Sequence, residues 1–165
     1  MKVFKHRYSL LSFAAALLLA SSVFAMWRVR PEVKVMLSGT VERDNQTVQI
    51  DKAGLLNPGE ILHWTILSHN AGDAPAHHYK TVGEIPSGTA YVTGSAKAGG
   101  DVTILFSIDQ GKTFATKPMI EQKQPDGSTR KVAAPASLYT HIRYEWDDPL
   151  TEGKQLAASY KVRVQ

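Results

Sequence analysis

The segment LHWTIL at residues 62–67 places Leu62, Trp64 and Ile66 at alternate positions of one short run. Successive side chains of an extended strand point to opposite faces, so this spacing predicts a strand that directs these three residues into a core. Four other segments repeat the period of two, and their predicted core residues are Val33, Val35 and Leu37; Val102, Ile104, Phe106 and Ile108; Ile142, Tyr144 and Trp146; and Ala158, Tyr160, Val162 and Val164. The pattern is typical of half-buried antiparallel strands.

Turn-forming residues separate these runs, as at Asn57-Pro58-Gly59, Pro86-Ser87-Gly88 and Asp126-Gly127-Ser128. After residue 25 no segment shows a convincing helical pattern, and the polar segment 122–135 is predicted to be a long loop or an edge hairpin. Many short strands at this spacing predict an all-β chain with one antiparallel β-sandwich domain over residues 26–165.

Residues 1–25 have the three-part layout of a secretory signal peptide. Lys2, Lys5 and Arg7 precede an uncharged apolar run over residues 10–20, and a small-residue segment ends at Ala25. We therefore predict a helical signal peptide and an extracytoplasmic product, in the periplasm, on the cell surface or in the medium. The alternative is an uncleaved anchor, because a spanning helix needs about 20 apolar residues and the uncharged stretch continues past Ala25. Cleavage would leave no stable membrane span.

The basic charge of the chain belongs to this first segment. The whole sequence has a formal net charge of +4, but three of its 19 Lys and Arg residues lie before Ala25 while all 15 Asp and Glu residues follow it. The remaining part is close to neutral and lacks the concentrated basic surface that nucleic-acid binding requires. The absence of cysteine excludes disulfides, thiolate metal ligands, a cysteine nucleophile and a lipid-modified cysteine.

A series of short motifs follows in a fixed order: Pro58-Gly59-Glu60, Trp64-Thr65-Ile66, Asn70-Ala71-Gly72-Asp73-Ala74-Pro75-Ala76, Ile85-Pro86-Ser87-Gly88-Thr89 and Tyr91-Val92 with Gly94-Ser95. This succession resembles the bacterial conserved repeat domain, also called domain of unknown function 11, of surface and cell-wall-associated proteins. The resemblance is strongest from Pro58 to Ser95, and residues 160–164 are similar to the last strand of that domain. It implies an immunoglobulin-like β-sandwich with a structural or interaction role, and it implies no substrate. This chain has one copy, where relatives often have tandem arrays.

Two residues of these motifs have a direct physical interpretation. Trp64 is expected to fill the core from a central strand. Asn70 is expected to end that strand, because its side chain can bond neighbouring backbone groups and begin a turn. The motifs therefore predict folding and carry no chemistry.

Ser107-Ile108-Asp109-Gln110-Gly111-Lys112-Thr113-Phe114 matches the Asp-box pattern S-x-D-x-G-x-T-[WF]. That box is familiar from sialidases and other propeller proteins, so it raises a hydrolase hypothesis. In the structural interpretation, Ser107 and Asp109 bond the backbone of a tight turn, Gly111 supplies a positive φ, and Phe114 packs on the core. A propeller needs several four-stranded blades and this chain has length for about one or two. We therefore favour a hairpin-stabilising motif.

Histidines provide candidate metal ligands. His63 and His69 share strand parity on the predicted outward face, and His77 and His78 follow the next turn. If that turn makes a hairpin, His69 and His78 are the candidates for a surface zinc or copper site. We favour exposed surface histidines, because no compact ligand spacing is present.

Other patterns are weaker than these. Asp147-Asp148 offers two carboxylates for calcium, but no D-x-D-x-D-G loop accompanies the pair. Asn45-Gln46-Thr47 matches a glycosylation sequon. The sequence contains no G-x-S-x-G elbow, H-E-x-x-H helix or phosphate-binding glycine loop. We predict no catalytic residue and no cofactor.

The leading hypothesis is an exported, non-enzymatic structural or interaction domain of the bacterial envelope or cell surface. Its predicted partner is another envelope or surface protein, bound by shape-complementary contact or by strand addition at an exposed edge, and no nucleic acid. The alternative is a carbohydrate- or metal-binding module, whose candidate aromatic residues are Trp27, Tyr79, Tyr91 and Tyr139. A hydrolase suggested by the Asp-box is the third hypothesis.

Overall fold

The computed structural model describes residues 29–44 and 46–165, so the predicted signal peptide over residues 1–25 lies outside the described residues. The prediction of an all-β fold with antiparallel strands is confirmed. The strands are β1 (Val33–Arg43), β2 (Gln46–Gln49), β3 (Ile61–Asn70), β4 (Lys80–Glu84), β5 (Thr89–Tyr91), β6 (Lys97–Ala98), β7 (Val102–Ser107), β8 (Met119–Lys123), β9 (Thr129–Ala133), β10 (His141–Trp146) and β11 (Gln155–Val164).

Helical structure in the described ranges is confined to two short 3-10 segments, η1 (Ile50–Lys52) and η2 (Ala136–Leu138). Within these ranges, the chain forms no helix with the length and apolar character needed to cross a membrane.

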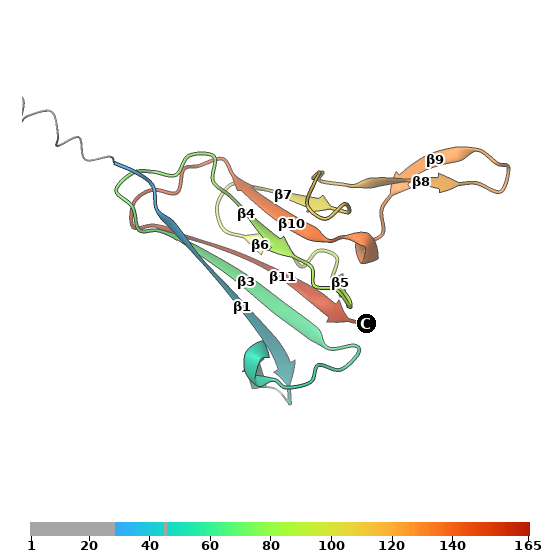
Figure 1. The fold of residues 1–165 in the computed structure, drawn as a ribbon, viewed down its shortest axis with the longest axis horizontal. Coiled ribbons are helices and arrows are strands. Elements are labelled where there is room, and N and C mark those ends of the chain that lie inside the picture. The colour runs from blue at the N-terminus through green and yellow to red at the C-terminus, as the bar shows by residue number, and fades with distance from the viewer. Residues whose placement is uncertain (1–28, 45) are drawn as a thin grey trace, which may run out of the picture.

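The strands form three antiparallel sheets (Figure 1). The largest has the order β2-β1-β3-β11-β5, with β6 also paired to β11. The second has the order β4-β10-β7, and β8 and β9 pair with each other as a separate two-stranded sheet. β3 is paired along almost its whole length with β1 on one side and with β11 on the other, so it is the centre of the larger sheet.

The two larger sheets share one core. Alternate residues of β3 and β11 point toward alternate residues of β10, as the period of two predicted. Trp64, expected at the centre, is half-buried and packs against the margin of the cluster. The fully buried residues from these three strands are Leu62, Ile66, Ala158, Tyr160 and Val162 on one sheet and Ile142, Tyr144 and Trp146 on the other.

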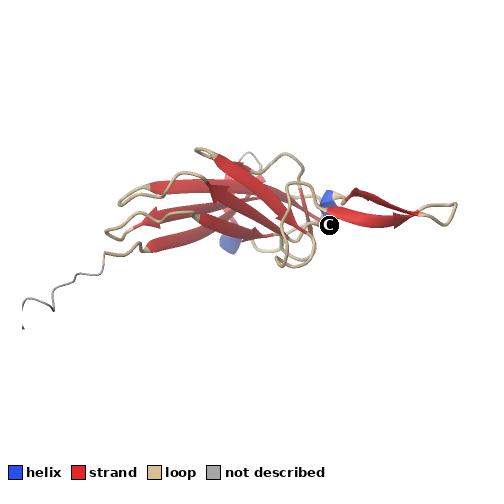
Figure 2. Cartoon of the chain, turned by 90° about the horizontal axis from the view of Figure 1, so that it is seen from above, coloured by secondary structure: helices blue, strands red, loops and turns tan. Residues whose placement is uncertain are grey.

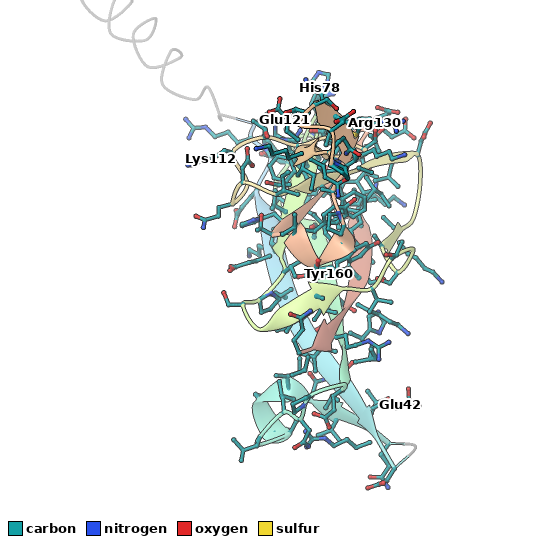
Figure 3. The ribbon with its side chains drawn as sticks, turned by 90° about the vertical axis from the view of Figure 1, so that its right-hand side faces the viewer. Glu42, His78, Lys112, Glu121, Arg130 and Tyr160 are labelled. Carbon is teal, nitrogen blue, oxygen red and sulfur yellow. The ribbon has the colours of Figure 1, made fainter. Side chains whose placement is uncertain are left out.

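Two buried phenols bridge the sheets in opposite directions. Tyr144 of β10 donates a hydrogen bond to the carbonyl oxygen of Ser159 in β11 at 2.8 Å. Tyr160 of β11, which lies between the sheets in Figure 3, donates to the carbonyl oxygen of Glu84 in β4 at 2.5 Å. Burial raises the pKa of both phenols. A buried hydroxyl without an acceptor costs about 1–3 kcal/mol, so these bonds hold the sheets in one relative position.

β1 departs from the expectation that Val33, Val35 and Leu37 enter the core. Val33 is half-buried, and Val35 and Leu37 are exposed. Further along the same strand Gly39 and Val41 are buried. The prediction is therefore wrong for the first half of β1.

The widths of the sheets explain this difference. The second sheet has three strands, and its edge strand β4 lies over β11, because a Cβ on Gly83 would meet the ring of Tyr160. At the other edge Phe106 of β7 packs against Tyr91 of β5, with ring centroids 5.2 Å apart. The second sheet thus covers the β11–β5 side of the larger sheet, and the first half of β1 lies beyond it.

The predicted loop or edge hairpin at 122–135 is part of a longer hairpin. β8 and β9 pair from Met119↔Ala133 to Lys123↔Thr129, and the hairpin extends past the ends of the other strands (Figure 2). In its turn, the backbone N–H and hydroxyl of Ser128 donate to Oδ1 of Asp126 at 2.9 and 2.6 Å. It adds to neither larger sheet.

Gly83→Ala tests the contact between the sheets. A Cβ at this position would lie 2.6 Å from Cε1 of Tyr160, and that ring is held in the core by its hydroxyl. We expect overpacking to lower the free energy of unfolding by about 1–3 kcal/mol, measured by urea denaturation. The matched control is Gly99→Ala, whose Cβ would meet no atom within 4 Å. Equal stabilities of the two variants would contradict this packing.

Candidate functional site

An apolar segment on β1 is the strongest candidate for a functional surface. Val35, Met36 and Leu37 are consecutive and expose 53%, 65% and 59% of their surface. They lie on the strand at the rim of the larger sheet (Figure 1). Single exposed apolar residues are ordinary on protein surfaces, whereas contiguous apolar surface marks sites of interaction. This segment is called the β1 edge below, and it comprises Val33 to Ser38.

The backbone of the β1 edge is open on one side. β2 pairs with β1 only from Thr40 to Arg43, so among the described residues Val33 to Ser38 have β3 as their strand partner and no strand on the other side. The N–H of Ala71 donates to the carbonyl of Glu32 at 2.8 Å and extends the β1–β3 ladder. Because antiparallel ladders alternate, even-numbered residues bond β3, and the open side presents the N–H and C=O groups of Val33, Val35 and Leu37. Beside Gly39 lies Ile50, which follows β2 in the same ladder.

The β1 edge has little of the protection that sheet edges usually carry. Charged side chains, prolines, bulges and short length commonly guard such edges. The edge strand β4 is guarded by Lys80 and Glu84, and β7 is bridged by Ala115 through two backbone hydrogen bonds to Phe106. The β1 edge has one charged residue, Lys34, whose Nζ lies 3.5 Å from Glu32 Oε1.

Apolar side chains lie on both faces of the β1 edge. On the core side, Val35 and Leu37 continue toward Gly39, over which the ring of Trp64 packs. The indole Nε1 of Trp64 is buried and has no hydrogen-bond acceptor among the described residues. On the outer side, Met36 pairs in register with Leu67 of β3. A strand added here would bury apolar surface on both faces at once.

The far end of β1 is held by an ion pair. Nε and Nη2 of Arg43 donate to the two carboxylate oxygens of Glu60 at 2.6 and 2.9 Å, and Nη2 also donates to the carbonyl of Leu55 at 2.7 Å. Glu60 accepts a further bond from the N–H of Asn57 at 2.7 Å. The bonds from Arg43, followed by that from Asn57, lower the pKa of Glu60 to about 2. This pair ties the loop before β3 to the end of β1.

The Asp-box residues form a local network at the end of β7. Oγ of Ser107 accepts from the N–H of Gly111 at 2.9 Å and donates to Oδ1 of Asp109 at 2.7 Å. Asp109 also accepts from the N–H and hydroxyl of Thr113 at 2.9 and 2.6 Å, and Gly111 has a φ of 79°. Each of these polar groups is occupied in shaping the turn. These bonds fix the shape of the turn after β7.

Phe114, the last residue of the Asp-box, differs from its expected position. The guanidinium carbon of Arg143 lies 4.2 Å from the centre of the Phe114 ring. Arg143 alternates with the buried Ile142 and Tyr144, so it points away from the core. Phe114 therefore packs on the outer face of the second sheet, where the cation stacks on the ring.

Asn70 ends β3, at a position that the sequence had indicated. Its side chain is fully buried, and Nδ2 donates to the carbonyls of Ala74 and Leu150 at 2.6 and 2.9 Å. Oδ1 accepts from the N–H groups of Glu32 and Gly72, both at 3.1 Å. One amide thus joins the start of β1, the turn after β3 and the segment before β11.

The candidate metal ligands lie on different structural elements. His69 is a half-buried residue of β3, in register with Lys34 and Gln155. His78 lies in the connection to β4, is exposed at the periphery in Figure 3, and has a φ of 50°. Across residues 29–44 and 46–165, no group of three or more His, Cys, Asp or Glu side chains is placed to hold a metal ion.

The remaining candidates are the aromatic residues of the carbohydrate-binding hypothesis, the carboxylates Asp147 and Asp148, and the sequon residue Asn45. Tyr79 is half-buried and stacks on Trp146, and Tyr91 is buried and stacks on the half-buried Tyr139. Asp147 and Asp148 are both exposed after β10. Two further candidates, Trp27 and Asn45, lie outside the described residues.

Met36 and the Arg43–Glu60 pair were missed by sequence reasoning. The sequence did contain a signal for Met36, because this apolar residue occupies a position that alternation assigns to solvent. Leu67 is likewise an apolar residue at a solvent-facing position of β3. Two apolar residues at solvent-facing positions of neighbouring strands indicate a face that is apolar on both sides. No comparable signal marks the ion pair, which depends on the path of the loop between η1 and β3.

Asp109→Ala should lower the melting temperature at neutral pH, because three hydrogen bonds from Ser107 and Thr113 lose their acceptor. Bonds from Thr113, then Ser107, hold the pKa of Asp109 below its ordinary value, so the loss should shrink as the pH falls below that value. The control is Asp148→Ala, an exposed carboxylate outside this network. Thermal unfolding followed by circular dichroism compares the two variants, and equal melting temperatures would count against the network.

Glu60→Gln should change how stability depends on pH. The folded pKa of about 2 lies below the ordinary 4.5, so the charged pair contributes stability above about pH 4.5 and loses it as the pH falls toward 2. We expect Glu60→Gln to be less stable than the unmodified protein at neutral pH, with the difference closing in that window. Denaturant unfolding at several pH values measures this. Glu42→Gln, an exposed position on the same strand, serves as the control, and parallel pH profiles for both variants would contradict the assignment.

Comparisons with protein-family models, curated proteins and solved structures find no match for this chain. The resemblance to the conserved repeat domain therefore depends on the motifs between Pro58 and Ser95.

Proposed function

We propose that this chain is an exported, non-enzymatic interaction domain of the bacterial envelope or cell surface, which binds protein through the β1 edge. The observation that carries the proposal is the run Val35-Met36-Leu37, exposed on a strand whose open side has no partner among the described residues. Strand addition is the binding mode that such an edge fits, because the incoming strand satisfies the open backbone groups and covers the side chains on both faces.

Backbone hydrogen bonds and apolar burial would both contribute to the free energy of strand addition at this edge. Each net backbone hydrogen bond contributes about 0.5–1.5 kcal/mol, and apolar burial adds roughly 25 cal/mol for each Å² removed from water. The edge presents donors and acceptors at Val33, Val35 and Leu37, and the ion pair between Arg43 and Glu60 holds the far end of β1. A strand held in this way is ordered before binding, so less entropy is lost on association.

Two parts of this proposal, export from the cytoplasm and an immunoglobulin-like fold, are supported by features of the sequence. The segment before Ala25 supports export, and the near-neutral charge that follows supports a protein partner over nucleic acid. The motifs from Pro58 to Ser95 support an immunoglobulin-like sandwich related to the conserved repeat domain. Two facing antiparallel sheets with a shared core are compatible with that assignment.

A photo-crosslinking amino acid placed at Met36 tests the proposal in the native host. We expect covalent capture of a protein, recovered in the envelope or secreted fraction, because Met36 lies at the centre of the exposed run. The matched control places the same group at Leu55, which is 90% exposed but lies in a loop outside the edge. Capture at Leu55 with none at Met36, or the absence of any protein adduct at Met36, would overturn the proposal.

A further inference from the structure

We infer that the outer face of the larger sheet carries a binding groove for a negatively charged polysaccharide. The groove runs over β11, between β3 and β6, and has a volume of about 270 Å³. This surface is separate from the β1 edge, so the inference goes beyond the proposed function and does not depend on it.

The register of three strands places the side chains of the groove on one face. Ser159 of β11 lies opposite Thr65 of β3 on one side and opposite Lys97 of β6 on the other. Two residues further along β11, Lys161 lies opposite His63. These positions of β11 alternate with its buried positions, so their side chains point away from the core.

Small side chains form the floor of the groove. Ala157 and Ser159 occupy successive outward positions of β11, between the larger side chains of β3 and that of Lys97. The volume is slightly below the range of about 300–1,000 Å³ that is typical of small-molecule sites. A protein partner covers far more surface, roughly 800 Å² on each side of an interface. The groove therefore fits a short unit of a polymer better than a folded protein.

The charge of this face selects an anion. Strands β3, β5, β6 and β11 contain no Asp or Glu, whereas Lys97, Lys161 and Arg163 are exposed on their outer side. None of these three cations forms an ion pair with another described residue. Lys97 and Lys161 are diagonal neighbours across β6 and β11, a separation that long side chains span. An anion bound between them would offset the repulsion of two like charges.

The polar groups beside the cations favour a saccharide over an acidic peptide. The hydroxyls of Thr65 and Ser159 can both donate and accept hydrogen bonds, as the hydroxyls of a sugar do. A peptide bound in an extended form needs open backbone groups of a sheet edge. At this point β11 is paired on both sides, with β3 and with β6, so the backbone offers none. The residues that line the groove include no aromatic ring, so charge and hydrogen bonds supply the affinity.

Isothermal titration of the purified protein, produced from the full sequence, tests this inference at low salt. The probes are polygalacturonate, dextran sulfate and uncharged dextran. We expect binding to a charged polysaccharide and none to dextran, with an affinity that falls as the salt concentration rises. The comparison of the two charged polymers shows whether carboxylate or sulfate is preferred. Binding of poly-glutamate as tight as that of both charged polysaccharides would overturn the assignment to a saccharide.

Paired substitutions distinguish the groove from general electrostatic attraction. Lys97→Gln combined with Lys161→Gln should weaken binding by about tenfold, because two exposed charge contacts are lost. The matched control combines Lys123→Gln with Lys131→Gln, which removes the same charge from the β8–β9 hairpin and should bind like the unmodified protein. Equal weakening by the two pairs would overturn the inference.

Ala157→Trp tests the groove without changing the charge. Ala157 is exposed, so the larger side chain should be tolerated by the fold while it fills the floor, and binding should be lost. Circular dichroism of each variant verifies folding. A folded Ala157→Trp variant that binds normally would overturn the inference. The absence of binding to either charged polysaccharide would do the same and would leave the proposed function of the β1 edge standing.

Discussion

Two tyrosine hydroxyls, each buried and each bonded to a backbone carbonyl of the opposite sheet, set the relation between the two halves of this molecule. Tyr144 reaches from the second sheet to Ser159, and Tyr160 reaches from the larger sheet to Glu84. A phenol can be buried at low cost only where an acceptor is within reach, so neither sheet can slide without orphaning a hydroxyl. Gly83 completes this constraint, because the absence of a side chain lets the Tyr160 ring approach β4.

The exposure of the β1 edge is a consequence of that alignment. With β4 fixed over Tyr160 and β7 packed beside Tyr91, the three-stranded sheet covers β11 and β5, and its cover ends before Val35 and Leu37. The same side chains would be core residues beneath a wider second sheet. The exposure of this edge and the internal packing of the domain therefore have one origin, which is the mismatch in width between the two sheets.

The ends of the strands are organised by short polar networks. The amide of Asn70 joins three segments at one end of the domain, and the Ser107–Asp109–Thr113 network closes the turn after β7. The Arg43–Glu60 pair performs the equivalent task for β1. Each network satisfies buried or half-buried backbone groups that a loop would otherwise leave unpaired. In each of these networks the polar side chains are bonded to backbone groups of neighbouring segments, whereas one side of the β1 edge has no strand partner among the described residues.

The sequence by itself determined the strand class, most of the core and the local turns, because alternation, the Asp-box and the bonds of Asn70 to Gly72 and Ala74 act between residues close together in the chain. The bonds of Asn70 to Glu32 and Leu150 join distant segments and appear only in the structure. It also held the signal at Met36, an apolar residue at a solvent-facing position. Only the tertiary structure decided that Val35 and Leu37 are exposed and that Phe114 lies on the outer face beneath Arg143. The physical reason is that a period of two reports which residues share a face of a strand, whereas the opposing sheet, built from distant segments, decides whether that face is covered.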